Sequence, residues 1–461
     1  MRSAVPSERP RSFSPSLMCS YCRSRFGDHE FWGMSHLRDS ALHVACAART
    51  VMRAVEQRRP SYRALFSIPG IPRLVASMLL ARTAGQMTSL ILVLFALERY
   101  GSPTIAGLAT FLSIAPGLLV SPIAGALLDR HGRTRLVVLD YAVAAISLGL
   151  LGALGIADAL PVPVLLVIVT VTSLTFPLST TGVRTLFPIL VPQHLWERAN
   201  AIDSNGYVVS SVFGPAAAGG LVAALGAPYA LFVPAAISAV AAGIAVGLRD
   251  PSTRADTGRL LADAWRGLVY VVRHPSLRAL ALGISLANVG WGIFFIALPV
   301  LVYTRLGGDA AYVGNLFALL GVVGFLAVLL FGRVSTRGRE HVYLAAAIVG
   351  EGVAFALAIF ARDAMLIAVV MALLGLATGP FDVTLFTVRQ RRTDLAWMGR
   401  AFAVSMALNF AGFPIGTALG GVIAPLSIDA AIVVAILGNV SGAIVCFFAL
   451  PREHAAGPGG S

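Results

Sequence analysis

The side chains with the clearest capacity for chemistry stand in one short polar segment that follows an apolar run. It is Gly125-Ala-Leu-Leu-Asp129-Arg130-His-Gly132-Arg133-Thr-Arg135. A carboxylate beside several guanidiniums on a tight glycine turn forms charge-assisted hydrogen bonds, which are stronger than those between neutral groups. The segment therefore predicts a latch, an ion-pair cluster that holds two parts of a molecule together in one conformation and releases them in another. The predicted latch residues are Gly125, Asp129, Arg130, Gly132 and Arg133.

A second group of candidates consists of polar residues inside long apolar segments. A charged group at the centre of a bilayer costs at least ~2.5 kcal/mol, so each such residue is a candidate for binding or proton transfer. Arg82 and Gln86 are four positions apart and share one helix face. Asp382 is the candidate for proton coupling, with a structural ion pair to a nearby arginine as the alternative. The complete set is Arg82, Gln86, Arg184, Asn288, Trp291 and Asp382.

The composition indicates which elements must position these residues. Of the 461 residues, 57% are hydrophobic and only 12% are charged, whereas soluble domains average about 25% charged residues. Soluble, disordered and disulfide-rich secreted classes are therefore excluded, which leaves a polytopic membrane protein. A helix needs roughly 20 apolar residues to cross the hydrocarbon core, and twelve such segments occur. They are 74–97, 103–128, 136–157, 161–183, 204–225, 228–248, 279–304, 310–332, 342–361, 364–387, 401–424 and 430–450.

The distribution of arginine predicts the orientation of these spans. One set of alternate loops carries most of the loop arginines, whereas the opposite set carries only Arg99, Arg305 and Arg362. Basic residues are concentrated in cytoplasmic loops, and an error in the number of spans would remove this asymmetry. We therefore expect a multi-pass protein of the cell membrane with both termini in the cytoplasm.

The polar segments divide the chain. We expect a disordered cytoplasmic extension over 1–62, because this segment lacks the apolar core of a signal peptide. After it we expect six spans over 63–248, a cytoplasmic loop over 249–278, six more spans over 279–451, and a cytoplasmic tail over 452–461. The central loop has apolar residues at helical spacing, which predicts a short amphipathic helix on the membrane surface. The extension leaves open a later start at Met52 or, less favoured, a zinc site built from Cys19, Cys22, His29, His36, His43 and Cys46.

The two halves also repeat each other. Gly107, Gly117 and Gly125 recur 207 positions later as Gly314, Gly324 and Gly332, and Ala199, Ala201, Gly214 and Gly219 recur 202 positions later as Ala401, Ala403, Gly416 and Gly421. A duplicated six-helix unit is typical of transporters with a binding site near the membrane midplane.

With twelve spans and a duplicated half, the latch segment resembles the G-x-L-x-D-R-x-G-R-[KR] loop of the major facilitator superfamily. The resemblance covers about residues 63–451. It implies an all-α membrane protein with two pseudo-symmetric six-helix bundles. It also implies that Asp129 and Arg133 hold the bundles together at the cytoplasmic side in the outward-open state. Thr134 departs from the pattern, where the family usually has a basic residue, and Arg135 follows it.

A second motif favours export. The fifth span contains Gly214-Pro215-Ala-Ala-Ala-Gly219-Gly220, which resembles the G-P-x-x-G-G motif of antiporters in the superfamily, with three intervening residues instead of two. A helix adapted only for close packing would look similar. The segment from Arg184 to Asn200 resembles the fourth-to-fifth loop of bacterial drug and siderophore exporters.

The resemblance also ranks the buried polar residues, because helices 1, 4, 7 and 10 line the cavity in this family. Glu351 lies in the peripheral ninth span, so a hydrogen-bonded structural role is favoured over proton carriage. We expect Asp140 and Asp203 to pair with loop arginines. Asn288 and Asn409 would bind a ligand or hydrogen-bond between helices.

The sequence therefore predicts export of small amphiphilic compounds by proton antiport, through alternating access. Protons are the expected coupling ion, and the expected partners are a small-molecule substrate and the lipid bilayer, not nucleic acid. No Walker A motif occurs, and we expect no enzymatic activity, cofactor or metal. Proton-coupled uptake and, from a different class, a polytopic membrane sensor or enzyme are the alternatives.

Overall fold

The computed structural model describes residues 61–248, 250, 260–393 and 398–451. Most of the predicted N-terminal extension, with its cysteines and histidines, and the whole of the predicted C-terminal tail lie outside the described residues. The part from Pro60 onward forms one compact unit.

Twelve helices among the described residues are long and apolar enough to cross a membrane, as predicted. Each overlaps one predicted segment. A short helix, α3 (Tyr62–Phe66), precedes them. The first six spans are α4 (Ile71–Tyr100), α5 (Pro103–His131), α6 (Arg133–Ile156), α7 (Val162–Leu190), α8 (Trp196–Leu225, after the 3-10 turn Gln193–Leu195), and α9 (Ala227–Ala230) with α10 (Phe232–Ala245). The other six are α12 (Pro275–Arg305), α13 (Ala310–Phe331), α14 (Glu340–Ile359), α15 (Ala364–Arg391), α16 (Met398–Phe410) with α17 (Gly412–Ile423), and α18 (Ile428–Ala449).

The turns after the first helix of each half show the duplication in the backbone. Gly101 and Gly307 are 206 positions apart, and both adopt left-handed conformations, with φ of 59° and 64°. Glycine adopts such φ values without steric cost. The next helix begins in each half with a side-chain cap, since Ser102 accepts from the backbone N–H of Ile105 and Asp309 from that of Tyr312. The two halves therefore repeat in local geometry as well as in sequence.

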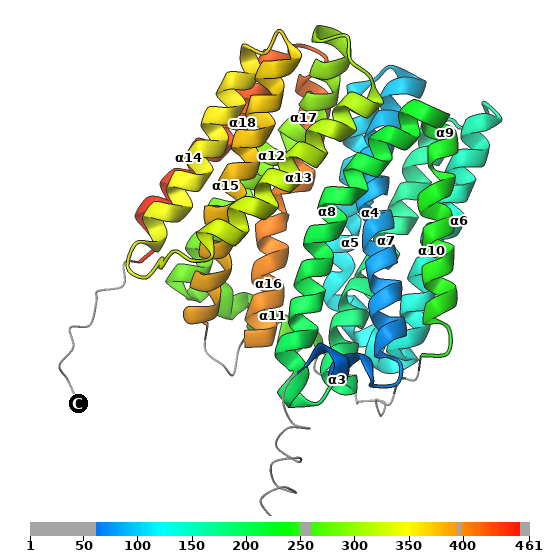
Figure 1. Cartoon of the computed structure of the whole chain (residues 1–461), viewed down its shortest axis with the longest axis vertical. Coiled ribbons are helices and arrows are strands. Elements are labelled where there is room, and N and C mark those ends of the chain that lie inside the picture. The colour runs from blue at the N-terminus through cyan, green and yellow to red at the C-terminus, as the bar shows by residue number, and fades with distance from the viewer. Residues whose placement is uncertain (1–60, 249, 251–259, 394–397, 452–461) are drawn as a thin grey trace, which may run out of the picture. The chain divides into compact units, whose positions relative to one another are not determined.

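The helices form two six-helix bundles, α4 to α10 and α12 to α18 (Figure 1). The bundles meet chiefly where α5 packs on α17 and α8 packs on α13. Gly107 of α5 lies against Gly421 of α17, and Gly219 of α8 lies against Gly314 of α13, so closely that an added Cβ would overlap the facing backbone. The repeat relates Gly107 to Gly314 and Gly219 to Gly421, so the two contacts are equivalent by the internal pseudo-symmetry.

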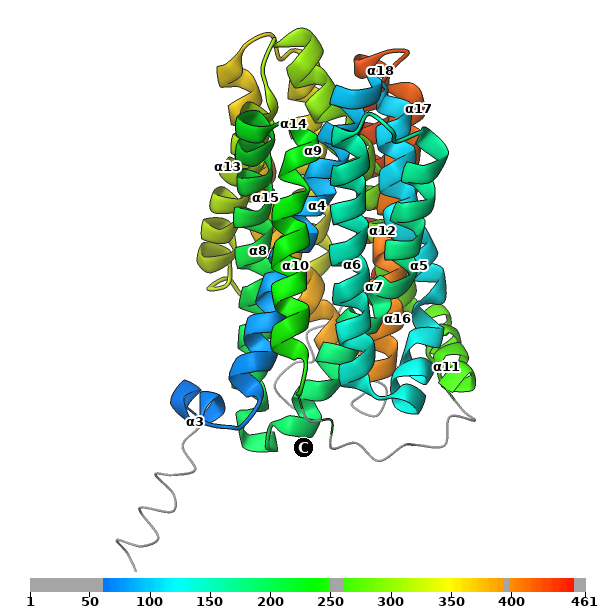
Figure 2. The same ribbon diagram turned by 90° about the vertical axis from the view of Figure 1, so that its right-hand side faces the viewer.

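Both glycine contacts lie toward one face of the molecule, here called the opposite face. There Thr104 donates to the backbone oxygen of Gly421 at 2.9 Å, and the Tyr303 hydroxyl donates to Glu98 at 3.2 Å. The ends of α9 and α17 lie at this face, whereas α3 and α11 lie at the other end of the helices (Figures 1 and 2). The bundles are therefore joined toward the opposite face.

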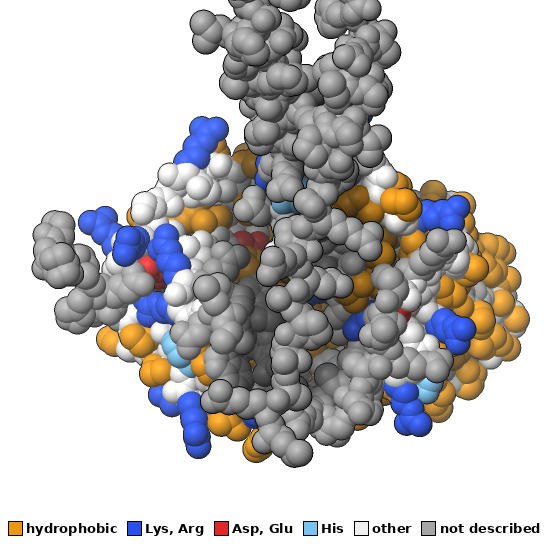
Figure 3. Space-filling view, turned by 90° about the horizontal axis from the view of Figure 1, so that it is seen from below, with side chains coloured by type: hydrophobic (Ala, Val, Ile, Leu, Met, Phe, Trp, Pro, Cys, Tyr) orange, Lys and Arg blue, Asp and Glu red, His pale blue; other side chains and the backbone are white. Residues whose placement is uncertain are grey.

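The other end is here called the arginine-rich face, because the loops that follow α5, α13 and α15 bring their arginines to it. Figure 3 views this face and shows arginine side chains at several separate places on it. The predicted amphipathic helix is present here as α11 (Leu260–Arg273). Its Val271 belongs to a small apolar cluster against which Val404 and Leu408 of α16 pack, whereas Trp265 is 65% exposed.

Candidate functional site

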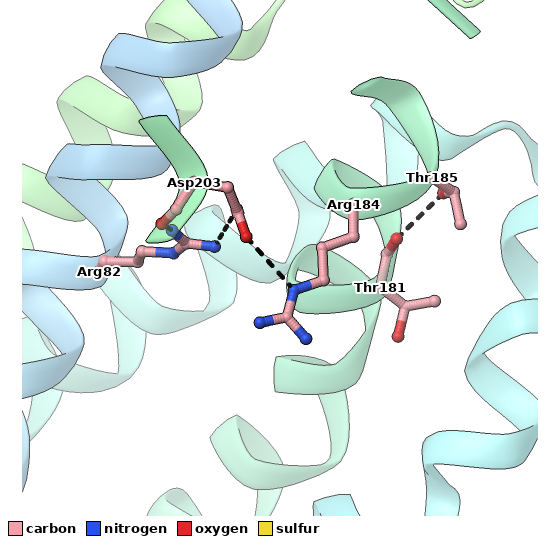
Figure 4. A network of polar contacts seen from close by, with 5 residues as sticks. All are labelled: Arg82, Thr181, Arg184, Thr185 and Asp203. Atoms are coloured by element: carbon pink, nitrogen blue, oxygen red, sulfur yellow. Dashed lines mark hydrogen bonds and ion pairs between the residues drawn. The ribbon is translucent and has the colours of Figure 1, made fainter. Parts of the chain in front are cut away.

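A polar network in the first bundle contains two of the predicted site residues (Figure 4). Arg82 of α4 donates to the carboxylate of Asp203 on α8 at 2.5 Å and to its backbone oxygen at 2.6 Å. Arg184 of α7 approaches the other carboxylate oxygen at 3.8 Å. Two guanidiniums therefore share one carboxylate, which leaves a net positive charge where three helices meet.

Burial differs across this network. The side chains of Arg82 and Asp203 are 17% and 19% exposed, whereas that of Arg184 is 53% exposed. The Arg82 guanidinium also lies over the ring of Tyr207, 5.7 Å from its centroid, within range of a cation–π contact. Arg82 is therefore fixed from several sides, and Arg184 keeps much of its donor surface available.

The expectation that Asp203 and Asp140 both pair with loop arginines holds only in part. Asp203 does pair with Arg184 at the end of α7, but its shorter ion pair is with Arg82, which lies well inside a span, because α4 and α8 pack closely. Asp140 is 4% exposed and faces the hydroxyls of Ser179 and Thr175, with no arginine paired to it among the ion pairs of the described residues. A buried carboxyl group can be satisfied by neutral donors on a neighbouring helix, and hydropathy does not reveal such donors.

The second bundle repeats this network with different side chains. Asn288 of α12 and Asn409 of α16 stand 206 positions after Arg82 and Asp203. The Asn288 amide donates to the backbone oxygen of Asn409 at 3.0 Å, as Arg82 does to that of Asp203. Of the two roles predicted for Asn288, the structure shows the interhelical hydrogen bond.

Arg389, near the end of α15, is a functional candidate that the sequence analysis missed. Its side chain is fully buried, donates to the Met406 sulfur and lies over the Phe386 ring. Because Arg389 stands about 205 positions after Arg184, it occupies the corresponding helix end in the second half. Only a residue-by-residue alignment of the two halves would have pointed to it.

The other cavity candidates of the second bundle are Trp291 of α12 and Asp382 of α15, and both side chains are partly exposed. The Trp291 ring meets that of Phe355 on α14, with centroids 5.9 Å apart. Glu351 of α14 is buried in the same bundle. Asn439 of α18 donates to Glu351 at 3.1 Å. Glu351 is thus hydrogen-bonded between helices, as favoured.

In the first bundle, Gln86 of α4 packs against Gly214 of α8, where an added Cβ would overlap it. Gly214 and Gly219 belong to the antiporter-like motif, together with Pro215 inside the helix and Gly220. The two motif glycines have different contacts: Gly219 meets α13 of the other bundle, whereas a Cβ at Gly220 would meet nothing within 4 Å. The motif therefore provides one contact within the first bundle and one between bundles.

The predicted latch segment forms the turn between α5 and α6. Gly132 has φ of 93°, and the backbone N–H of Arg133 donates to Asp250 at 2.7 Å. The Arg133 guanidinium approaches the other Asp250 oxygen at 4.0 Å. Asp250 follows the sixth span, so this tie lies within the first half, and the sequence analysis did not select it. The side chain of Asp129 lies outside the described set, Arg130 is exposed, and Gly125 has open space beside it.

A buried glutamate occupies the related turn of the second half. Glu340, at the start of α14, is 1% exposed and pairs with Arg391 at 3.4 Å and Arg392 at 3.8 Å. The loop from Arg333 to Glu340 corresponds to the latch segment of the first half and has no aspartate, and Glu340 supplies a carboxylate there.

Comparison with known proteins identifies the family. The family model of the Major Facilitator Superfamily matches residues 74–312 and 280–461. The chain belongs to this superfamily. It is 41% identical to an MFS-type transporter, y4rN, of Sinorhizobium fredii over 402 residues, which cover 84% of this chain and 96% of the relative.

Two further relatives are named for efflux. The multidrug efflux pump Tap of Mycolicibacterium fortuitum is 26% identical, over 75% of this chain and 87% of that protein. Macrolide efflux protein A of Streptococcus pyogenes is 21% identical, over 74% of this chain and 88% of that protein.

Solved structures show the same fold. The nucleoside transporter NupG aligns with a TM-score of 0.62 at 12% identity, over 81% of this chain and 97% of that one. A bacterial homologue of the human lysosomal transporter Spinster, in an inward-facing conformation, aligns with a TM-score of 0.65 at 15% identity, over 83% of this chain and 98% of that one. The chain is therefore a transporter of the superfamily with two pseudo-symmetric bundles of six membrane-spanning helices.

Proposed function

We propose that this transporter exports small amphiphilic compounds, drug-like molecules or metabolites of the siderophore or antibiotic type, in exchange for protons. The observation that supports export most directly is the similarity to two proteins named for efflux over about three quarters of the chain. The antiporter-like motif of α8 supports the same direction, because one of its glycines forms the contact between the bundles.

Alternating access in this molecule would use the pseudo-symmetric contacts as a hinge and seal. We infer that the arginine-rich face is cytoplasmic, in agreement with the placement of basic loops. Since the described contacts of α5 with α17 and of α8 with α13 lie toward the opposite face, this arrangement corresponds to a state closed to the outside. The outward-open state would break these contacts and engage the latch residues Asp129 and Arg133 at the cytoplasmic side.

The predicted cavity residues would bind substrate as follows. Arg184 offers a half-exposed guanidinium beside the fixed Arg82–Asp203 pair, and Trp291 offers an aromatic ring. A largely apolar pocket with few polar anchors suits amphiphilic molecules. Asp382 would bind the exchanged proton.

Accumulation of ethidium and erythromycin in an efflux-deficient bacterial host tests this proposal. Expression should lower accumulation, and both a protonophore and Asp129→Asn should abolish the effect. The matched controls are an empty vector and Gly243→Val on α10, which adds a side chain into open space. Unchanged accumulation with the protein confirmed in the membrane contradicts broad export. Higher accumulation that depends on the proton gradient favours uptake instead.

A further inference from the structure

The network of Arg82, Asp203 and Arg184 contains two positive charges and one negative charge (Figure 4). Arg82 donates to one carboxylate oxygen of Asp203 at 2.5 Å, whereas the Nε of Arg184 lies 3.8 Å from the other oxygen. Charge-assisted hydrogen bonds from a guanidinium to a carboxylate measure about 2.7–2.9 Å, so Arg184 approaches Asp203 without a hydrogen bond. Asp203 therefore neutralises Arg82, and the charge of Arg184 is only loosely balanced.

The pair of Arg82 and Asp203 is fixed by the packing of α4 on α8. Arg82 also donates to the backbone oxygen of Asp203 at 2.6 Å. A Cβ at Gly206 of α8 would overlap the Leu79 side chain of α4, which shows how closely the two helices approach. The pair cannot change partners without separating these helices, so Asp203 is held by Arg82 and cannot move toward Arg184.

Arg184 presents most of its donors to its surroundings. Figure 4 shows its two terminal nitrogens directed away from Asp203, and its side chain is 53% exposed. A guanidinium is a planar fork that matches the two oxygens of a carboxylate. Tyr207, one turn after Asp203 on α8, is 52% exposed and its ring lies beside the Arg82 guanidinium. An open cationic fork and a half-exposed aromatic ring thus belong to one network.

The related position of the second bundle is occupied differently. Arg389 of α15 corresponds to Arg184, and Asn409 corresponds to Asp203. Arg389 is fully buried, donates to the Met406 sulfur and has the amide oxygen of Asn409 as a further acceptor. Its guanidinium is enclosed by the bundle, whereas that of Arg184 is half-exposed. The repeat therefore leaves one of the two arginines open to a ligand.

We propose that Arg184 recognises an acidic group of the substrate, a carboxylate or a similar oxyanion, and that the apolar body of the same molecule packs on Tyr207. The proposal rests on export of amphiphilic compounds and narrows those that use this site to acids. The acid accepts two hydrogen bonds from the Arg184 fork, while Asp203 stays paired with Arg82. Arg184 stands within two turns of Leu190, where α7 ends, and the bundles are joined toward the opposite face. The acid therefore enters from the arginine-rich face, the side from which an exporter takes up its substrate.

Binding of three compounds of similar size to the purified full-length protein in detergent, measured by titration calorimetry, tests the proposal. They are 2-naphthoate, the neutral 2-naphthamide and the cationic 2-naphthylmethylammonium. We expect naphthoate to bind roughly tenfold more tightly than the amide, because only the acid forms charge-assisted hydrogen bonds with Arg184. Arg184→Gln should remove this preference, and Arg184→Lys, which keeps the charge without the fork, should keep part of it. Arg73→Gln, at an exposed arginine near the start of α4, should leave it unchanged.

Asp203→Asn tests the sign of the charge that the site accepts. This substitution removes the negative charge beside Arg184 and keeps both arginines, so naphthoate should bind roughly fivefold more tightly. A site for cations would instead bind 2-naphthylmethylammonium best and lose it in Asp203→Asn. That result would overturn the proposal, and so would equal binding of naphthoate and naphthamide or equal losses in Arg184→Gln and Arg73→Gln.

Accumulation in the efflux-deficient host separates this proposal from export itself. Expression should lower the accumulation of 2-naphthoate. Arg184→Gln should abolish this effect and leave the accumulation of ethidium, which is a cation, at the level of the unmodified protein. If the purified protein prefers naphthoate through Arg184 but expression lowers the accumulation of neither compound, the proposed export is at fault and the acid site stands. If ethidium is exported and naphthoate does not bind, export stands and the acid site is wrong.

Discussion

The contact between Gly219 and Gly314 makes a prediction about which face of the transporter opens. A Cβ at Gly219 would lie 2.5 Å from the Cα of Gly314, whereas ordinary contacts begin at 3.4 Å. Because the obstruction is backbone, α8 and α13 must separate by about 1 Å to admit a side chain. Overpacking of this kind costs about 1–3 kcal/mol, which corresponds to a roughly 5- to 150-fold shift in a conformational equilibrium. We therefore expect Gly219→Val to favour the state that is open at the opposite face.

Distances between spin labels on the two bundles measure this shift. Tyr229 and Leu426 are exposed, at 54% and 83%, near the opposite face of the first and second bundles. With cysteines placed there in a chain free of other cysteines, Gly219→Val should move the distance distribution to longer values. Gly220→Val is the matched control, since it carries the same cost in helix propensity and adds its side chain into open space. An unchanged distribution in Gly219→Val, or an equal change in both variants, would refute this reasoning.

Three other contacts give further predictions. Asp203→Asn leaves the Arg82 guanidinium without its carboxylate. Because the pair is mostly but not fully buried, we expect the free energy of unfolding to fall by about 1–3 kcal/mol, which would be measured as a lower Tm in detergent. Asp429→Asn removes the carboxylate from the more exposed ion pair with Arg305 and should lower the free energy of unfolding by under about 1 kcal/mol. Equal losses of stability in the two variants would contradict this ranking of the two ion pairs. Tyr303→Phe removes the hydrogen bond to Glu98 between the bundles. It should therefore lengthen the same label distance by a smaller population shift, about fivefold for about 1 kcal/mol, whereas a shift to shorter distances would contradict it.

The number of spans and their approximate positions could be predicted from the sequence. The thickness of the hydrocarbon core fixes the length of an apolar segment, and all twelve predicted segments overlap a helix. The amphipathic α11 was equally predictable, since a helix at a polar–apolar boundary has apolar residues at helical spacing. The glycine repeats indicated the duplication, because close helix contacts tolerate few residue types.

The partners of the polar residues could not be predicted in the same way. The contacts of Arg82 with Asp203, of Arg133 with Asp250, and of Asn439 with Glu351 each join residues far apart in the chain. A membrane-spanning helix is apolar on the faces that contact lipid and on those that contact other helices, so its sequence has little periodicity to show how it is rotated. Hydropathy therefore determined which segments cross the membrane, and only the packing of the helices decided which charged and polar groups meet between them.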